Sequence, residues 1–361
     1  MRIGLPREIK AGEARVALRP PEIATLTGAG HDVVVERGAG LASGVDDAQY
    51  EAAGALLTGV HAAAFDAELV VKVKELQPVE YPLVRPGTIL LGFQQFAVEP
   101  AYLDVALSSG ATFIACETIE SDDVDAAHRL PILAAMSRVA GRMAVRLGAK
   151  GLTGSEDADL DGTDVIVIGA GAAGSAAALE AARRRARVGV FAASPRRFDA
   201  LARAANGPMA MGVFDAARLR ALLPTTRLLI GAVLVAGRTS PRLLDRAMIA
   251  SMPPGSVFVD VGIDQRGIAE TSRMTSLGDP FFTVDGVIHC GVPNLPALEP
   301  RAASEAYAAA VLPHVVALAE RGGDALAPGS GLSRGVQVRR GSIVDARLAL
   351  DTRRRPKPVA N

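Results

Sequence analysis

A glycine motif between an apolar run and a helical run constrains this chain most strongly. Gly169, Gly171 and Gly174 lie in DVIVIGAGAAGSAAALEAARRR, in the middle of the chain. The spacing G-x-G-x-x-G is typical of a strand that turns tightly into a helix whose N-terminus receives a pyrophosphate. The first glycine permits the turn, the second lets backbone amides approach the anion, and the third lets helix and strand pack closely. The motif predicts a dinucleotide-binding unit; a glycine-rich turn without a ligand is the alternative.

The strand after the motif indicates which dinucleotide fits. An NAD site usually carries an acid about 20 residues after the glycines, whereas an NADP site replaces it and supplies an arginine for the 2′-phosphate. Here ARVGVF is followed by a segment without a carboxylate, which includes Ala192, Ser194, Arg196 and Arg197. Ser194 can donate a hydrogen bond, and either arginine can hold the phosphate as a bidentate fork. The segment favours NADP, with NAD possible; a solvated helix start is the alternative.

Length and charge bound the remaining possibilities. The 361 residues predict two domains, and 39 basic residues balance 39 acidic ones, so nothing indicates a nucleic-acid partner. The chain shows no uninterrupted apolar run of membrane-spanning length and no signal peptide in MRIGLPREIK, so we expect a cytoplasmic protein. Five scattered histidines lack zinc spacing, so no metal site is expected. Cys116 and Cys290 are expected to be small buried hydrophobic residues.

The first part of the chain alternates strand candidates with helical stretches, which is typical of a parallel α/β sheet. A proline-started helix is expected from residue 20, and a long helix over 131–150 is expected to carry the chain into a second domain. The polar stretch 153–164 reads as a surface linker. The strand candidates are residues 1–6, 31–36, 69–74, 88–93 and 112–117.

The second half repeats the alternation. An alanine-rich helix over 302–321 is expected to end at Gly322 and to return to the first domain, and the remainder, with its solvated RRRPKP tail, shows little core-forming capacity. We therefore predict an α/β protein with two doubly wound Rossmann-like domains, the first completed by the C-terminal helices. Residues 1–131 plus 301–361 form the substrate (catalytic) domain and 132–300 the NAD(P)-binding domain. The further strand candidates are residues 187–191, 227–234, 256–262 and 286–292.

Laid out in this way, the chain resembles the alanine dehydrogenase family, which shares its fold with the soluble nucleotide-binding subunit of proton-translocating transhydrogenase. The resemblance covers almost the whole chain in ordered motifs. It rests on RIGLPREIKAGEARVALRPPEIATLTGAGHDVVVERGAG, LVVKVKE, IACETI, MSRVAGR, GAGAAG, LIGAVLVAGRTSPRLL, VFVDVGIDQRG and GVPNLP.

The resemblance implies a role for individual residues. Arg15 matches the arginine that clamps the substrate carboxylate, and Lys74 matches the lysine that binds the 2-oxo acid carbonyl. Asp264 matches the carboxylate that faces nicotinamide and substrate, while Ser137 and Asn294 match positions that contact the cofactor. Independently of the family, a guanidinium fork suits a carboxylate, and a lysine in an apolar strand is costly unless its charge is used.

The chain also departs from the family. Gln95 stands where alanine dehydrogenases carry their catalytic histidine, and a glutamine cannot exchange a proton near neutral pH. Ala192 replaces the usual ribose-binding aspartate, and the linker lacks the family's glycine-rich loop. Asp264 is then the candidate for proton transfer or iminium stabilisation; a structural role is favoured for His289 over that of a substitute acid. Lys72 is predicted to share a sheet face with Lys74 and to be an edge or rim lysine.

These features predict an NADP-preferring oxidoreductase that interconverts an amino acid or a secondary amine with a 2-oxo acid. An opine-type synthase similar to carboxyethylornithine synthase is an alternative, because that enzyme shares the V-P-N-x-P segment at 292–296 and lacks the glycine-rich loop. A non-catalytic nucleotide-binding protein like the transhydrogenase subunit is a second alternative. The expected partners are small molecules, and the resemblance implies a homo-oligomer.

Overall fold

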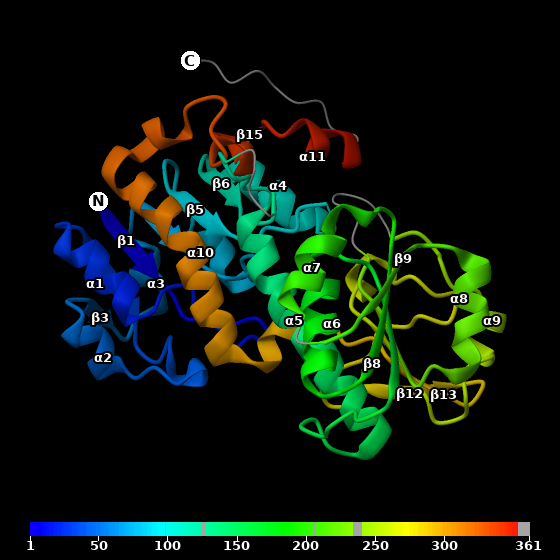
Figure 1. Ribbon diagram of the computed structural model, residues 1–361. Helices are drawn as coiled ribbons and strands as arrows, with labels where there is room; N and C mark the ends of the chain where they lie inside the picture. Colours follow the sequence, from blue (N-terminus) through cyan, green and yellow to red (C-terminus); the bar gives the residue numbers. More distant parts are fainter. Residues whose placement is uncertain (98, 124–127, 206, 234–239, 353–361) are drawn as a thin grey trace. The chain divides into compact units, whose positions relative to one another are not determined.

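The structure, a computed structural model, describes residues 1–97, 99–123, 128–205, 207–233 and 240–352 (Figure 1). The chain divides into two compact units. The first unit comprises Met1–Met136 and Pro300–Asn361, and the second unit comprises Ser137–Glu299. The sequence analysis places the corresponding boundaries at 131/132 and 300/301.

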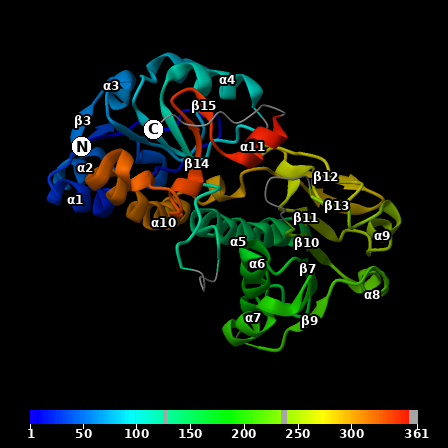
Figure 2. The same cartoon turned by 90° about the horizontal axis from the view of Figure 1, so that it is seen from above.

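An eight-stranded sheet forms the centre of the first unit (Figures 1 and 2). Its order is β15-β14-β6-β5-β4-β1-β2-β3. β1 to β6 run parallel, β14 pairs antiparallel with β6, and β15 pairs antiparallel with β14. The order reverses between β1 and β4, so the carboxyl ends of these strands meet at a topological switch point, where α/β sheets bind ligands. The strands are β1 Arg2–Leu5, β2 Asp32–Glu36, β3 Leu56–Thr58, β4 Leu69–Val71, β5 Ile89–Gly92, β6 Thr112–Ala115, β14 Val336–Arg339 and β15 Ser342–Ile343.

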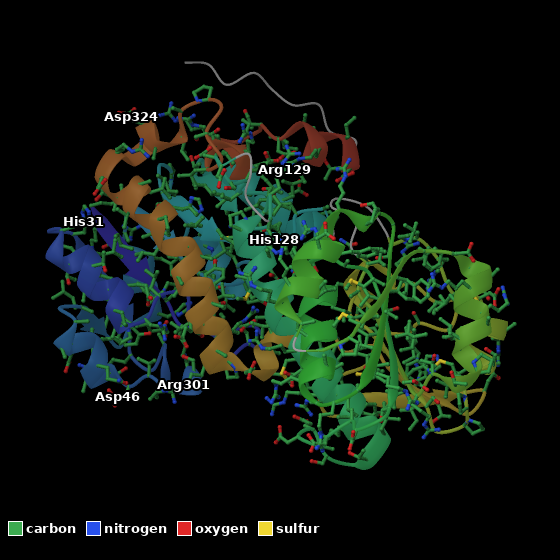
Figure 3. All side chains as sticks on the ribbon, in the orientation of Figure 1. His31, Asp46, His128, Arg129, Arg301 and Asp324 are labelled. Atoms are coloured by element: carbon green, nitrogen blue, oxygen red, sulfur yellow. The ribbon has the colours of Figure 1, made fainter. Side chains whose placement is uncertain are left out.

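Short helices connect these strands and are capped by their own sequence. Asp46, labelled in Figure 3, accepts the backbone N–H of Gln49 at 2.9 Å and thereby caps α2. The helices of the first unit are α1 Pro20–Gly28, α2 Asp47–Ala52, α3 His61–Phe65, α4 Pro100–Ser109, α10 Pro300–Arg321 and α11 Ala346–Asp351, with 3-10 segments η1 Leu41–Ser43, η2 Pro78–Leu83, η7 Gly322–Leu326 and η8 Ser333–Gly335.

Helix α10 brings the chain back to the first unit, as the sequence predicts. By length and composition alone, Pro300–Leu326 is apolar enough to cross a membrane. One face of α10 is nevertheless buried within the unit. The Tyr307 hydroxyl donates to the carbonyl of Lys72 at 2.8 Å, and Ser304 Oγ accepts the N–H of Val16 at 2.9 Å. These contacts are those of a core helix.

The second unit is built on a seven-stranded sheet in the order β12-β13-β11-β10-β7-β8-β9, with β12 antiparallel and the other strands parallel. Its strands are β7 Asp164–Ile168, β8 Arg187–Ala192, β9 Ala210–Val213, β10 Leu228–Gly231, β11 Val257–Asp260, β12 Phe281–Val284 and β13 Val287–Cys290. Its helices are α5 Pro131–Thr153, which begins in the first unit, α6 Ala172–Arg183, α7 Phe198–Ala204, α8 Ala216–Leu222 and α9 Arg246–Ala250, with 3-10 segments η3 Pro195–Arg197, η4 Leu223–Thr225, η5 Ile263–Gln265 and η6 Leu295–Leu298.

Glycines in α5 let this helix approach its neighbours closely. A Cβ atom at Gly141 would lie 2.0 Å from the carbonyl oxygen of Ala173 in α6. A Cβ atom at Gly148 would lie 2.5 Å from the side chain of Leu228 in β10. The second unit therefore depends on small residues along α5 for the packing of this helix against α6 and the sheet.

The structure confirms the fold class and the predicted strands, and it adds several that the sequence analysis misses. β3, β9 and β12 are short and lie at or next to a sheet edge. Their residues are mostly half-buried or exposed. Continuous apolar runs mark strands that are buried on both faces, so edge strands such as these lack the signal. Cys116 and Cys290 are both buried and free, as expected.

The C-terminal segment corrects the expectation that the chain has little core-forming capacity after α10. Val338 in β14, Ile343 in β15 and Leu348 in α11 are buried in the cluster that contains Phe96 and Phe113. The prediction is wrong because each element is short, and the turn between the two strands interrupts the apolar pattern. The RRRPKP tail, residues 353–358, lies outside the described residues.

Two leucines of α11 provide a matched test of this core. Leu348 is 3 % exposed and Leu350 is 79 % exposed. Leu348→Ala should lower the free energy of unfolding by about 2 to 4 kcal/mol, because it leaves a cavity in the core. The control Leu350→Ala should change it by less than about 0.5 kcal/mol. Urea unfolding followed by circular dichroism measures both values; equal effects would show that α11 does not belong to the core.

Candidate active site

The glycine motif forms the turn between β7 and α6. Gly169 has φ +111°, and a Cβ atom there would lie 2.2 Å from the carbonyl oxygen of Ala232. A Cβ atom at Gly174 would lie 1.8 Å from the carbonyl oxygen of Gly169, so a side chain at either glycine would collide with backbone. A Cβ atom at Gly171, which precedes α6, meets no atom within 4 Å. The loop is closed at its base and open at Gly171, and the N-terminus of α6 there fits a pyrophosphate.

The carboxyl end of β8 lies beside this loop, because β7 and β8 pair in parallel. Ala192 is the last residue of β8 and is buried. Ser194 and Arg196 are exposed, and Arg197 is half-buried at the end of η3. Ala192 thus ends the strand next to the glycine loop, and Ser194, Arg196 and Arg197 follow it; their contact with the adenosine end of a dinucleotide stays a prediction.

A buried carboxylate that the sequence analysis misses shapes the loop that carries Asp264. Asp260 ends β11, and its carboxylate accepts the N–H groups of Gly262 at 3.1 Å and Ile268 at 2.8 Å. It also accepts the hydroxyl of Ser272 at 2.5 Å. Burial raises the pKa of the Asp260 carboxyl group. Asp264 lies in η5, within the loop that these bonds hold, and its side chain is exposed.

The other predicted residues of the second unit occupy different elements. Ser137 is half-buried in α5. Asn294 is half-buried before η6 and has φ +54°, a left-handed conformation that asparagine tolerates better than most residues. His289 in β13 is buried, and its ring contacts Thr271 Oγ1 at 2.8 Å and the carbonyl of Val287 at 2.9 Å. Burial lowers the pKa of His289, which fits a neutral, structural imidazole.

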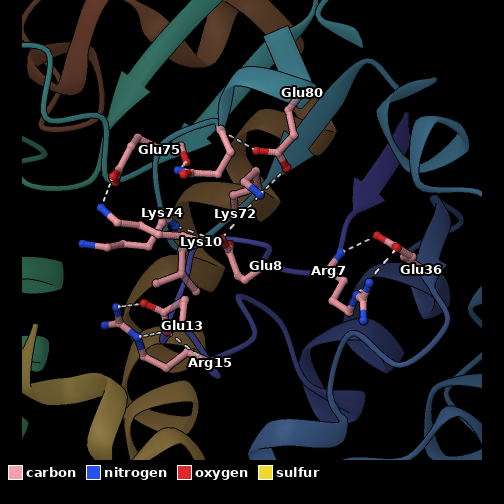
Figure 4. A network of polar contacts seen from close by, with 12 residues as sticks. Arg7, Glu8, Lys10, Glu13, Arg15, Glu36, Lys72, Lys74, Glu75 and Glu80 are labelled. Carbon is pink, nitrogen blue, oxygen red and sulfur yellow. Dashed lines mark hydrogen bonds and ion pairs between the residues drawn. The ribbon is translucent and has the colours of Figure 1, made fainter. Parts of the chain in front are cut away.

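The predicted substrate-binding residues of the first unit follow the strands at its switch point. Arg15 lies in the segment after β1, Lys74 follows β4, and Gln95 follows β5. Because neighbouring parallel strands end at the same edge of a sheet, these residues share the carboxyl edge. Figure 4 shows Arg15 and Lys74 within one network of polar contacts.

Arg15 is buried and already holds a carboxylate of its own chain. Its Nε donates to Glu13 Oε1 at 2.6 Å, and its Nη2 donates to Glu13 Oε2 at 2.5 Å. Nη1 lies 3.3 Å from the sulfur of Met136. The Glu13 side chain is fully buried. Glu13 thus orients the guanidinium, and a substrate carboxylate would have to share Arg15 with Glu13 or displace Glu13.

Lys74 is buried in a group of cations and carboxylates. Burial lowers the pKa of its ammonium group; the charge of Glu75 opposes this effect, and the charges of Arg15 and Lys10 add to it. Lys10 forms an ion pair with Glu75 (Figure 4). Lys74 therefore releases its proton at lower pH than an ordinary lysine, which suits a group that both binds a carbonyl and exchanges a proton.

Gln95 is held by its backbone rather than by its side chain. Its φ is +51°, its side chain is exposed, and its N–H donates to Glu117 Oε1 at 2.9 Å. The same carboxylate accepts the N–H of Gln94 at 3.1 Å. Burial raises the pKa of the Glu117 carboxyl group, and the charge of Lys74 opposes that shift. The sequence analysis misses Glu117, although it lies at the end of the predicted strand 112–117.

Lys72 is not the rim lysine that the sequence analysis predicts. Its side chain is fully buried, and its Nζ lies 2.7 Å from Glu80 Oε1 and 3.4 Å from Glu8 Oε2 (Figure 4). Burial alone lowers the pKa of Lys72, but the two carboxylates outweigh this effect and raise it. The prediction is wrong because Glu8, distant in the sequence, and Glu80, eight residues later, compensate the buried charge of Lys72.

A histidine extends this group of charges toward the surface. His61 Nε2 lies 3.3 Å from Glu80 Oε1, and His61 Nδ1 lies 2.6 Å from Glu36 Oε2. The hydrogen bond to Glu36 and the contact with Glu80 raise the pKa of His61 to about 9. The five side chains Glu36, His61, Glu80, Lys72 and Glu8 form what we call the ion-pair chain, in which acids and bases alternate.

The raised pKa of His61 makes the stability contributed by the ion-pair chain depend on pH. An unfolded histidine has a pKa of about 6.5, so the contribution is complete below that pH and is lost as pH rises through about 9. We expect His61→Gln to destabilise the protein by about 1 to 3 kcal/mol at pH 6 and by much less at pH 10. Denaturant unfolding of both proteins across this range measures the difference. A difference that does not change with pH, or that His31→Gln reproduces, would contradict a charged His61.

Comparison with known proteins places this geometry in a family. The sequence profile described as alanine dehydrogenase/PNT, N-terminal domain, matches residues 4–140, and the profile of the C-terminal domain matches residues 137–346. An alanine dehydrogenase of Halomonas elongata is 42 % identical over 354 residues, which cover 95 % of this chain and 94 % of that protein. An alanine dehydrogenase of Bacillus subtilis is 36 % identical over 362 residues, which cover 97 % of this chain and 94 % of that protein.

Solved structures agree with this result. A structure of L-alanine dehydrogenase superposes with a TM-score of 0.91 at 35 % identity, covering 98 % of this chain and 99 % of that one. The structure of a transhydrogenase from Sinorhizobium meliloti gives a TM-score of 0.83 at 26 % identity, covering 96 % of this chain and 99 % of that one. Two domain profiles, relatives of nearly equal length and a shared fold lead to one conclusion: the chain belongs to the alanine dehydrogenase/PNT family.

Proposed function

We propose that this protein is an NAD(P)-dependent oxidoreductase that interconverts an amino acid, or a secondary amine, with a 2-oxo acid. The observation that carries the proposal is the pair of buried cations, Arg15 and Lys74, at the carboxyl edge of the first sheet. Ligands of α/β sheets bind at the carboxyl ends of the strands beside a switch point, and a guanidinium fork and an ammonium group there suit the carboxylate and the carbonyl of a 2-oxo acid. The relatives named alanine dehydrogenase support the same reaction class.

In this proposal the chain's own residues bind and orient the substrate. Arg15, oriented by Glu13, holds the carboxylate, and Lys74 donates a hydrogen bond to the carbonyl or stands beside the imine that replaces it. The bound dinucleotide supplies or accepts the hydride. Asp264 serves proton transfer or stabilises the iminium ion, and Gln95 orients the carbonyl without exchanging a proton.

The dinucleotide fits the second unit. Its pyrophosphate would lie over Gly171 at the start of α6, and Ser137 and Asn294 would contact it elsewhere. We propose a preference for NADP, because Ala192 offers no carboxylate to the ribose while Ser194 and two arginines follow it. A cytoplasmic location and a homo-oligomeric assembly belong to the same proposal, on the resemblance alone.

A substrate panel tests the function. Purified protein is given 2-oxo acids with ammonia or with amino acids, and NADH or NADPH, and the oxidation of the nicotinamide is followed by absorbance. We expect turnover with at least one 2-oxo acid and expect Lys74→Met to lower kcat/KM by about 100-fold or more. Lys150→Met, which removes an exposed lysine of α5, is the control and should behave like the parent.

The panel also separates the alternatives. Turnover only with a second amino acid as the amine would identify an opine-type synthase, which the replaced histidine at Gln95 leaves open. Nucleotide binding without turnover on any 2-oxo acid would reject the oxidoreductase and leave a nucleotide-binding protein. Full activity of Lys74→Met would remove Lys74 from the site.

The cofactor preference has its own test at the end of β8. The variant Ala192→Asp/Arg196→Ala/Arg197→Ala adds an acceptor for the ribose hydroxyls and removes the cations for the 2′-phosphate. NADPH binding should weaken by about 1 to 3 kcal/mol while NADH binding improves. Titrations followed by nucleotide fluorescence measure both, with Arg203→Ala in α7 as the control. If the parent already binds NADH more tightly than NADPH, the proposed preference is wrong.

A further inference from the structure

The backbone beside Lys74 is hydrogen-bonded to the side chain of Glu8, at a place where a parallel strand would otherwise supply a carbonyl. The parallel ladder between β1 and β4 ends at the pair Gly4 and Val70. Beyond it, Glu8 Oε1 accepts the N–H of Val73 at 2.6 Å and lies 3.4 Å from the N–H of Lys74. The Glu8 carboxylate thus takes over the hydrogen bonding that a carbonyl of β1 would otherwise supply.

The opposite side of the same segment is fixed by backbone. The N–H of Lys72 donates to the carbonyl of Leu91 at 2.9 Å, and the N–H of Phe93 donates to the carbonyl of Val73 at 3.0 Å. The segment from Lys72 to Lys74 is therefore fixed on one side by the continuation of β5 and on the other side by Glu8. Removing the Glu8 contact leaves that second side without its acceptor.

Glu8 is held in place by its neighbour in the ion-pair chain, Lys72. Lys72 Nζ lies 3.4 Å from Glu8 Oε2, and both side chains are almost completely buried. On its other side Lys72 contacts Glu80, which accepts the N–H of Gln77 at 2.6 Å. A buried charge that loses its partner is strongly unfavourable, so the position of Glu8 depends on Lys72 and the position of Lys72 depends on Glu80.

The proposed reaction has no direct use for these groups. Glu8 contacts Lys74 through the backbone N–H, and the ammonium group of Lys72 is neutralised by the carboxylates of Glu8 and Glu80. A lysine whose ammonium group binds a carbonyl has to be held within a fraction of an ångström of its working position, because small displacements of a reacting group reduce rates strongly. Surrounding groups that fix the backbone are a direct way to meet this requirement.

We propose that Glu8, held in place by Lys72, is the positioning residue for Lys74. The proposal rests on the proposed function, in which Lys74 binds the carbonyl of the 2-oxo acid. Glu8 acts on the reaction by fixing the backbone of Lys74 at the carboxyl end of β4, and it does not touch the substrate. The buried pair Glu8 and Lys72 is then a specific requirement of the reaction and not only a contribution to stability.

A double-mutant cycle tests this role. Glu8→Gln keeps an oxygen for the N–H of Val73 but leaves Lys72 facing a neutral group, and Lys72→Met leaves Glu8 without its cation. We expect each single variant to lower kcat by about tenfold or more with little change in the KM for the dinucleotide. The double variant Glu8→Gln/Lys72→Met leaves neither charge of this pair without its partner, and Glu80, which loses Lys72, keeps its ion pair with His61. The kcat should therefore recover to within about threefold of the parent.

Glu22→Gln is the matched control. The Glu22 carboxylate also is buried, accepts the N–H of Arg19 at 3.0 Å and lies 3.6 Å from its guanidinium, but it caps α1 and does not contact residues 72–74. This variant should lose stability without losing kcat. If Glu8→Gln behaves like Glu22→Gln, with a lower melting temperature and the kcat of the parent, the positioning role is overturned.

A readout that does not need turnover separates this proposal from the proposed function. Hydrogen exchange measured by mass spectrometry over residues 72–75 should be at least tenfold faster in Glu8→Gln, and acetic anhydride should label Lys74 at a changed rate. Unchanged exchange and labelling would overturn the positioning role, whatever the activity. Full turnover of Lys74→Met would instead overturn the proposed function, even if exchange at 72–75 depends on Glu8. If Glu8→Gln does not fold, Lys72→Met and the double variant carry the same measurements.

Discussion

The parallel pairing of β1 with both β2 and β4 is the constraint on which the candidate site of the first unit depends. The chain order reverses at this point, so the segments after β1 and β4 leave the sheet side by side. Residues 6–15 follow the first strand and residues 72–75 follow the second. Their charged side chains meet because of this topology, although some sixty residues separate them in the sequence.

Several cations are buried at this edge of the sheet, and carboxylates of the same chain compensate their charges. Arg15, Lys72 and Lys74 are buried, and burial of unpaired cations is strongly unfavourable. Glu13 neutralises Arg15, while Glu8 and Glu80 neutralise Lys72. Burial lowers the pKa of Lys74 despite the charge of Glu75, and a lowered pKa of this kind is typical of functional lysines.

The sequence predicts those features that depend on local pattern. The glycine loop and the central strands could be recognised because glycines without room for a side chain and runs of buried β-branched residues leave a direct trace in the sequence. Lys72 and the C-terminal strands could not. The burial of Lys72 depends on Glu8 and Glu80, and β14 depends on pairing with β6 more than two hundred residues earlier. A single sequence contains no signal for such partners.

Gln95, which follows β5 at this edge of the sheet, limits which groups can supply protons there. Gln95 cannot exchange a proton near neutral pH, and its backbone is fixed by the Glu117 carboxylate. The same environment lowers the pKa of Lys74 and raises that of Glu117. The lowered pKa of a lysine and the raised pKa of a carboxyl group both lie closer to neutral pH, which is the shift that acid and base catalysts require. In the proposed function, Lys74 and Glu117 provide a chemical basis for proton exchange at this edge of the first sheet.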